Sequence, residues 1–287
     1  MIPVLAGLTT AAILFIVTVG LSLVFGTMRV INLAHGTFYM IGAYLVTFTF
    51  GTITSRSLGF TLGLFLSSAA VAILGIVIEM LILRRLYGAE HLLQLLATWA
   101  LLMILEQLVI MIWGPQNRTG VIPASLSGSI VVTGQQFPVY DLFLILCAVV
   151  IAVLLWIVIQ RTRLGRLIRA AVQDIELIRV LGVNVNRLYT QIFAIGAFLA
   201  ALGGALMGPA TSAGPGMDVN ILVEAFIVSV IGGLGNIWGA AIGALIIGLF
   251  QSLGNLVVPE LAGLAPYIVM ILVLVIRPQG LLGKMEG

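Results

Sequence analysis

Four ionisable side chains stand within long apolar runs of this sequence, where each could bind a polar solute or carry a proton: His35, Glu79, Glu106 and Glu224. Burying such groups in hydrocarbon is costly, so an ionisable residue in a membrane segment is a candidate functional residue. For Glu79 the structural alternative is an ion pair with Arg84 or Arg85. For Glu106 it is an interhelical hydrogen bond. No second histidine or cysteine is close to His35 in sequence, so we expect no metal site.

Familiar catalytic and nucleotide-binding motifs are missing from the sequence. It has no Gly-x-Ser-x-Gly elbow and no His-Glu-x-x-His pair. A Walker A loop needs Gly-Lys-Ser/Thr to hold phosphates, whereas the only lysine, Lys284, precedes Met285. We therefore expect no catalytic residue, no ATP hydrolysis by this route and no cofactor held by this chain. The single cysteine, Cys147, cannot form an internal disulfide and is expected to pack against its neighbours.

The elements that would position these residues are membrane helices. Of the 287 residues, 61% are apolar and only 8% are charged, against about 25% charged in soluble domains. The composition predicts an all-α, polytopic membrane protein with one transmembrane domain, residues 1–287. The net charge of +3 does not indicate a nucleic-acid partner. No basic residue precedes Arg29, so we expect the first apolar run to remain as a helix rather than to be cleaved as a signal peptide.

A membrane-spanning helix needs about 20 apolar residues. On this basis we predict nine spans, at residues 4–26, 32–50, 59–82, 92–113, 141–160, 188–209, 220–234, 237–257 and 264–282. The glycine-rich turn 232–236 is expected to divide the seventh span from the eighth, because glycine is a poor helix former. The seventh span is short, so a re-entrant segment is the alternative there.

Basic residues lie mainly on the cytoplasmic side of membrane proteins. With residues 161–187 placed inside, only Arg56 and Arg118 of the 13 basic residues fall outside. This asymmetry predicts an N-terminus outside and a C-terminus inside. The loop 114–140 would then be external, and its alternating β-branched residues favour a short hairpin that either docks an external protein or only connects two helices.

The segment 161–187 is the largest polar stretch of the chain and carries six of the 13 basic residues. Its apolar positions follow helical spacing, so we predict one helix over Ala170–Leu181 lying on the cytoplasmic face. Gly182 would end this helix as its C-terminal cap. Such a loop is a surface on which a soluble partner could act, although a solvated connector is the alternative.

Four stretches resemble the branched-chain amino acid ABC transporter permeases. They are GTMRVINLAHGTFYMIGAYL (Gly26–Leu45), RAAVQDIELIRVLGV (Arg169–Val183), GGLGNIWGAAIGALIIG (Gly232–Gly248) and IRPQGLLG (Ile276–Gly283). The resemblance implies a permease subunit of an importer in a bacterial or archaeal inner membrane. It also implies a second homologous permease, two cytoplasmic ATPase subunits that bind ATP and Mg, and an external substrate-binding protein.

For a permease of this kind we expect two groups of functional residues. Those expected to couple the chain to the ATPase are Arg169, Ala170, Gln173, Asp174, Glu176, Leu181 and Gly182. Those expected near the translocation path, close to the inner or outer ends of their spans, are Asn32, His35, Gly36, Glu224 and Asn236. The cargo would be a branched-chain amino acid or a similar solute, with urea, short amides and aromatic acids as alternatives. A stand-alone secondary transporter, with Glu106 carrying protons, or a channel is the competing class.

Overall fold

The computed structural model describes residues 1–52, 56–132 and 134–283. Apolar helices dominate the described residues: α1 (Ile2–Met28), α2 (His35–Thr52), α3 (Arg56–Leu81), α4 (His91–Trp113), α5 (Val139–Arg161), α8 (Val185–Met207), α9 (Met217–Gly232), α10 (Ile237–Val257) and α11 (Ala265–Ile276). Shorter elements connect them: η1 (Leu83–Leu86), β1 (Arg118–Thr119), β2 (Ser129–Val132), β3 (Gln135–Pro138), α6 (Arg163–Gln173), α7 (Ile175–Val180), β4 (Ser212–Ala213) and η2 (Pro259–Leu264).

Each of the nine predicted apolar segments coincides with one of these helices, so the mostly helical, polytopic fold is confirmed. Six of the helices are long and apolar enough to cross a bilayer, while α11 belongs to a shorter apolar segment. The last helix ends at Ile276 rather than at the predicted 282. Arg277 takes an extended backbone before Pro278, as the residue before a proline generally does. The number of spans and the orientation of the termini stay predictions.

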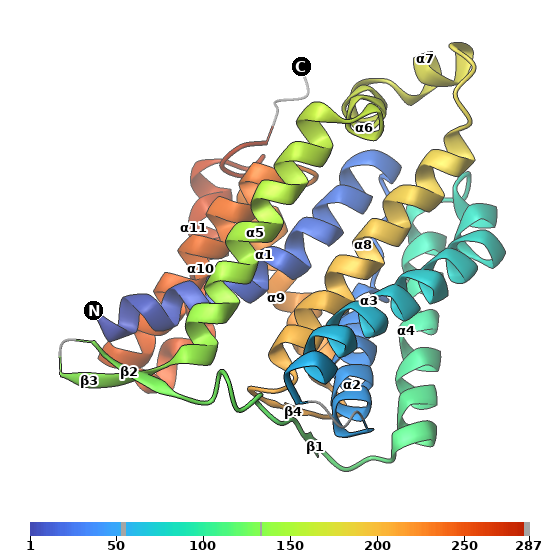
Figure 1. Cartoon of the computed structure of the whole chain (residues 1–287). Helices are drawn as coiled ribbons and strands as arrows, with labels where there is room; N and C mark the ends of the chain where they lie inside the picture. Colours follow the sequence, from blue (N-terminus) through green and yellow to red (C-terminus); the bar gives the residue numbers. More distant parts are fainter. Residues whose placement is uncertain (53–55, 133, 284–287) are drawn as a thin grey trace.

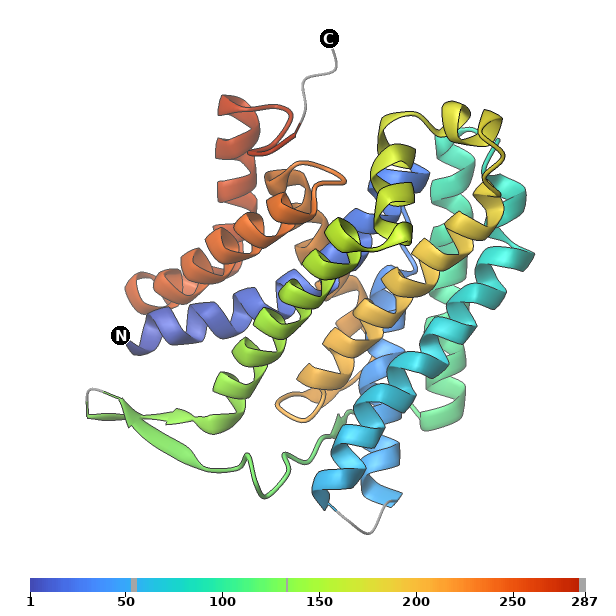
Figure 2. The ribbon, with the colours of Figure 1, turned by 45° about the horizontal axis from the view of Figure 1, so that its top comes forward.

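Helix α1 lies at the centre of the bundle (Figure 1). Helices α10 and α11 lie on one side of it, and α2, α3 and α4 lie on the other (Figure 2). Most of α1 is buried from Ala11 to Val24, which explains why it is apolar on all faces. It runs parallel to α9, because Ser22 Oγ lies 3.0 Å from Ser229 Oγ and the Thr18 hydroxyl donates to the carbonyl of Ala225 four residues earlier.

Glycines allow the closest helix contacts. A Cβ at Gly204 of α8 would overlap the backbone oxygen of Tyr39 in α2, and one at Gly42 of α2 would overlap that of Ala201 in α8. Gly232 and Gly239 bring α9 and α10 together in the same way. Close backbone contact at small residues is how helices pack in lipid. The glycine-rich turn therefore does what the sequence predicted, dividing two helices, and it also packs them.

The two ends of the bundle carry different structures. Strands β2 and β3 form the predicted hairpin of the 114–140 loop, with Ile130 opposite Phe137. Strand β1 of the same loop pairs with β4, which lies between α8 and α9. Helices α6 and α7 lie at the opposite end of the molecule (Figure 1). The 114–140 loop and the 161–187 segment thus stand at opposite ends of α5.

Candidate coupling surface and polar sites

The segment predicted to be one helix, Ala170–Leu181, is two helices, so that prediction was wrong. Helix α6 ends at Gln173 and α7 begins at Ile175. The break is at Asp174, whose Oδ1 accepts a hydrogen bond from the backbone N–H of Leu177 at 3.0 Å. Aspartate competes with the helical backbone in this way and favours the N-cap position. The result is an elbow in which α6 packs on the bundle and α7 projects beyond it (Figure 1).

Helix α6 is held against the end of α5. The Thr162 hydroxyl caps it by accepting from the backbone N–H of Gly165 at 3.1 Å. Gly165 packs directly on the backbone of Ile159 in α5, where a Cβ would overlap. Ile168 and Ala171 of α6 are buried. The apolar face predicted for this segment is therefore present in α6, where it fixes the base of the elbow.

Helix α7 exposes apolar side chains at the tip of the elbow. Val180 is 84% exposed and Leu181 is 72% exposed, while Ile178 is buried. Gly182 has a positive φ of 82°, and its N–H donates to the carbonyl of Arg179 while that of Val183 donates to Ile178. These are the two bonds of a Schellman motif, so the predicted C-terminal cap at Gly182 is confirmed.

The residues predicted for coupling occupy different positions on this elbow. Asp174 caps α7, and Glu176 pairs with Arg179 at 3.0 Å on its exposed surface. Arg169 instead donates to the backbone carbonyl of Ile159. Gln173 lines a cavity of about 930 Å³ beside α6. The set thus divides between the outer tip of the elbow and its inner, bundle-facing side.

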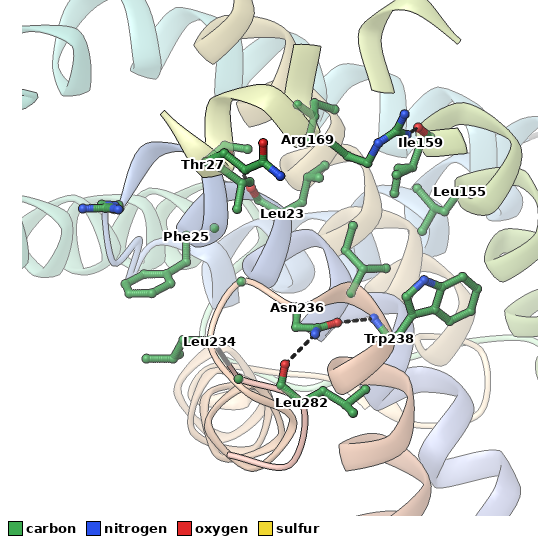
Figure 3. Close-up of a pocket in the computed structure, with 18 of the residues that line it drawn as sticks. Leu23, Phe25, Thr27, Leu155, Ile159, Arg169, Leu234, Asn236, Trp238 and Leu282 are labelled. Atoms are coloured by element: carbon green, nitrogen blue, oxygen red, sulfur yellow. Dashed lines mark hydrogen bonds between the residues drawn. The ribbon is translucent and has the colours of Figure 1, made fainter. Parts of the chain in front are cut away.

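The same cavity contains one residue of the predicted translocation path, Asn236 (Figure 3). Its Oδ1 accepts from the backbone N–H groups of Trp238 and Gly239, at 3.0 and 3.1 Å. Its Nδ2 donates to the carbonyl of Leu282 at 2.7 Å. Asn236 therefore caps α10 and holds the segment after α11 at this end of the bundle.

His35 lies deeper than predicted. Its Nε2 is 3.0 Å from the backbone oxygen of Val17, and Val17 precedes the end of α1 at Met28 by eleven residues, about 16 Å along a helix. His35 is still at one end of its helix, as predicted, but that end lies inside the bundle rather than at its surface. Residues 29–34 pass back into the bundle before α2 begins, and irregular backbone at such depth is tolerated where protein covers it.

A buried aspartate that was not predicted from the sequence lies beside the residues that follow His35. Asp218, in the first turn of α9, is fully buried, and its Oδ2 accepts from the Thr37 hydroxyl at 3.3 Å. Gly36 packs against the backbone oxygen of Asp218. Asn32 is also buried, and neither atom of its amide has a hydrogen-bond partner. The sequence signal for Asp218 was a carboxylate two residues before a predicted apolar span. A carboxylate at such a position is equally typical of an exposed loop.

Glu224 of α9 and Glu106 of α4 are two further glutamates, and the carboxyl of Glu106 interacts electrostatically with Asp218 of this polar group. Glu224 accepts from Gln251 of α10 at 3.2 Å and lines a second cavity of about 270 Å³ with Tyr39 and Asn220. Glu106 of α4 is half-buried, and its carboxyl interacts with the backbone of Gly216. The predicted path residues are therefore brought together only in part, as Asn32, His35 and Gly36. Among the residues that the structure describes, no three ionisable or thiol ligands gather to hold a metal ion.

Glu79 forms an ion pair with Arg84, which is the structural role given as its alternative in the sequence analysis. Arg84 NH2 lies 3.2 Å from its Oε2, and the hydroxyls of Tyr87 and Thr190 donate to the same carboxylate at 2.6 and 2.7 Å. Burial and the adjacent carboxylate raise the pKa of Tyr87, so this phenol stays a donor. The cluster fixes the turn between α3 and α4 to the first turns of α8, directly after the elbow.

Comparison with known proteins gives one consistent family. Residues 4–274 match the family model described as "Branched-chain amino acid transport system / permease component". The high-affinity branched-chain amino acid transport system permease protein BraD of Pseudomonas aeruginosa is 29% identical over 292 aligned residues, covering 98% of this chain and 94% of BraD. The high-affinity branched-chain amino acid transport system permease protein LivH of Salmonella typhimurium is 29% identical over 300 aligned residues. These cover 98% of this chain and 94% of LivH.

A shorter similarity leads to a protein with a different named cargo. The fructose import permease protein FrcC of Rhizobium meliloti is 36% identical over 110 residues, which cover 36% of this chain and 31% of FrcC. No solved structure matches this chain.

Proposed function

Because this chain belongs to the permease family of branched-chain amino acid transport systems, we propose that it is the transmembrane permease subunit of an ATP-binding-cassette importer. It is a multi-pass membrane protein, and we place it in the inner membrane with α6 and α7 in the cytoplasm. Its partners are a second homologous permease, two ATPase subunits that bind ATP and Mg, and an external substrate-binding protein.

The exposed tip of the α6–α7 elbow is the observation that carries this proposal. Val180 and Leu181 are apolar and solvent-facing at the end of a segment otherwise rich in arginine. An apolar patch with a polar rim is typical of a protein–protein contact. The base of the elbow is packed on α5 and its far end leads directly into α8. A force on the tip would therefore reach two membrane helices.

Transport then follows from a rigid-body change of the helices. Closure of the ATPase subunits moves the elbow, and α5 and α8 move with it. The cargo passes between this chain and the second permease, and Asn32, His35, Gly36 and Glu224 are the residues closest to its route. We propose a branched-chain amino acid as the cargo, since BraD and LivH carry that name. Urea, short amides and aromatic acids are alternative cargoes of the same machinery.

The test is association of the permease with its ATPase subunit. A charge on the apolar tip, in Leu181→Asp or Val180→Asp, should reduce co-purification of the ATPase by about tenfold, a common effect of disrupting a central interface contact. The matched control is Val131→Asp in the β2–β3 hairpin, because Val131 is also 72% exposed. Equal loss in control and tip variants would contradict the proposal.

Transport by the isolated chain would also contradict it. A secondary transporter or channel, the competing class, moves its solute without an ATPase. Proteoliposomes that contain the purified chain alone should therefore show no uptake of leucine, with or without a pH gradient. Uptake should appear only when the ATPase subunits, the second permease and the binding protein are added together with ATP.

A further inference from the structure

The 930 Å³ cavity beside the elbow has features that the proposed ATPase contact at Val180 and Leu181 does not use. It lies between the end of α1, the helices α5 and α6, and the turn joining α9 to α10. Its inner wall is apolar and includes Phe15, Leu23 and Leu155. Arg169 and Asn236 add polar groups to the lining (Figure 3). The cavity thus combines an apolar wall with polar groups in one lining.

The charges that line this cavity in the described part of the chain are positive. Among the described residues that line it, the charged ones are Arg29 and Arg169, and none is an aspartate or glutamate. Neither arginine forms an ion pair within the part of the chain that the structure describes. Gln160, Gln173 and Asn236 add amide groups to the same lining. Two arginines without a carboxylate partner, in a partly enclosed space, attract an anion.

Tryptophans mark the level of the cavity in the membrane. Trp156 of α5 and Trp238 of α10 line it and are 41% and 50% exposed. Exposed tryptophan is typical of the boundary between hydrocarbon and head groups. Directly beyond Trp156, helix α5 presents an outward apolar stripe made of Val149, Val150, Val153, Leu154 and Ile157. The cavity therefore opens where a lipid head group and its acyl chains would meet the protein.

We propose that this cavity binds the anionic head group of an inner-leaflet phospholipid, with its phosphate at Arg29 and Arg169 and its acyl chains along α5. Basic cavities between membrane helices on the cytoplasmic side bind lipid head groups in this manner. More than half of the lining residues are apolar, which favours a lipid over free phosphate. The choice of leaflet rests on the orientation given under the proposed function, but the affinity for an anionic lipid does not.

Lipid binding to the purified full-length chain tests this proposal. After removal of bound lipid, native mass spectrometry compares phosphatidylglycerol with phosphatidylcholine of identical acyl chains. We expect the anionic lipid to bind at least about tenfold more tightly, since each basic residue near a phosphate contributes about fivefold. Arg169→Gln should reduce this preference about fivefold, and Arg29→Gly with Arg169→Gln should abolish it.

Two design choices keep the result interpretable. Arg29 has a positive φ of 54°, so glycine removes its charge while fitting the left-handed backbone. Arg163→Gln is the matched control, because Arg163 is an exposed arginine of α6 outside the cavity. It should keep the full preference for phosphatidylglycerol, and all variants should share the unfolding temperature of the natural chain.

Other outcomes would overturn the proposal. Equal binding of the two lipids, or an unchanged preference in the double variant, would show that the arginines hold no head group. Competition by millimolar inorganic phosphate would assign the cavity to a free anion. Competition by leucine would place it on the cargo route. None of these results bears on the ATPase association experiment, so the two proposals can fail separately.

Discussion

At the residue scale, Glu79 shows how a buried charge is retained in an apolar protein. Its side chain is fully buried, yet its carboxylate accepts from Arg84, Tyr87 and Thr190. Buried charges are tolerated when they are paired and their remaining lone pairs are satisfied. The three donors come from the α3–α4 connection and from α8, so one carboxylate joins segments about a hundred residues apart in sequence.

Substitution of Glu79 should therefore destabilise the fold. Glu79→Gln leaves Arg84 without its counter-charge and Thr190 without a strong acceptor. We expect a loss of about 3 kcal/mol, the usual range for breaking a buried pair, measured by denaturant unfolding in detergent. The control is Glu176→Gln, which removes an exposed pair with Arg179 and should change stability by less than about 0.5 kcal/mol. Similar effects of the two substitutions would contradict this view of Glu79.

At the element scale, the packing of α2 on α8 depends on glycine. Gly204 lies against the backbone of Tyr39, with no space for a methyl group. The neighbouring atom is a carbonyl oxygen in a helix, which cannot rotate away as a side chain can. The helices must then separate if a Cβ is introduced, and the loss extends along the whole interface.

Gly204→Ala should lower the free energy of unfolding by about 2 kcal/mol, a typical cost of overpacking. The measurement is the unfolding midpoint of the purified chain. Gly88→Ala is the control, because Gly88 has no heavy atom within 4 Å of the added Cβ. We expect Gly88→Ala to leave the midpoint unchanged, and a stable Gly204→Ala variant would mean that α2 and α8 are not rigidly packed.

The elbow gives a second element-scale prediction. Helix α7 has only six residues, too few to be stable without its caps. Asp174→Ala removes the N-cap and should cost about 1 kcal/mol. Hydrogen exchange of the amides of 175–180 should then accelerate about fivefold, while that of α8 stays unchanged. Gln173→Ala, which changes the preceding residue but no cap, should not alter the exchange.

Much of the element order could be predicted because apolar runs and glycine clusters act locally. The division of α9 from α10 at 232–236 and the cap at Gly182 are of this kind. The break at Asp174 was missed because helical spacing of apolar residues continues through it, while the side-chain cap depends on a single carboxylate. The depth of His35 was missed because it depends on how residues 29–34 fold back into the bundle. The spacing of apolar residues along the sequence does not indicate such a path.

At the scale of the whole molecule, the two ends of the bundle differ in charge and in structure. The 114–140 loop pairs with the α8–α9 connection at one end, through β1 and β4. The elbow, the α9–α10 turn and the end of α1 surround one cavity at the other end. Helix α9 therefore begins beside the first end and finishes at the second, which favours a crossing helix over the re-entrant alternative.

The orientation of these ends can be measured with single cysteines. In a Cys147→Ser background, Ser125→Cys lies in the 114–140 loop and Val180→Cys lies at the tip of the elbow, and both positions are exposed. Because basic residues concentrate around the elbow, we expect an impermeant maleimide to label Ser125→Cys on intact cells. Val180→Cys should be labelled only after the membrane is permeabilised. The reverse pattern would place the elbow outside, where no ATPase could reach α7 and no inner-leaflet lipid could reach Arg169.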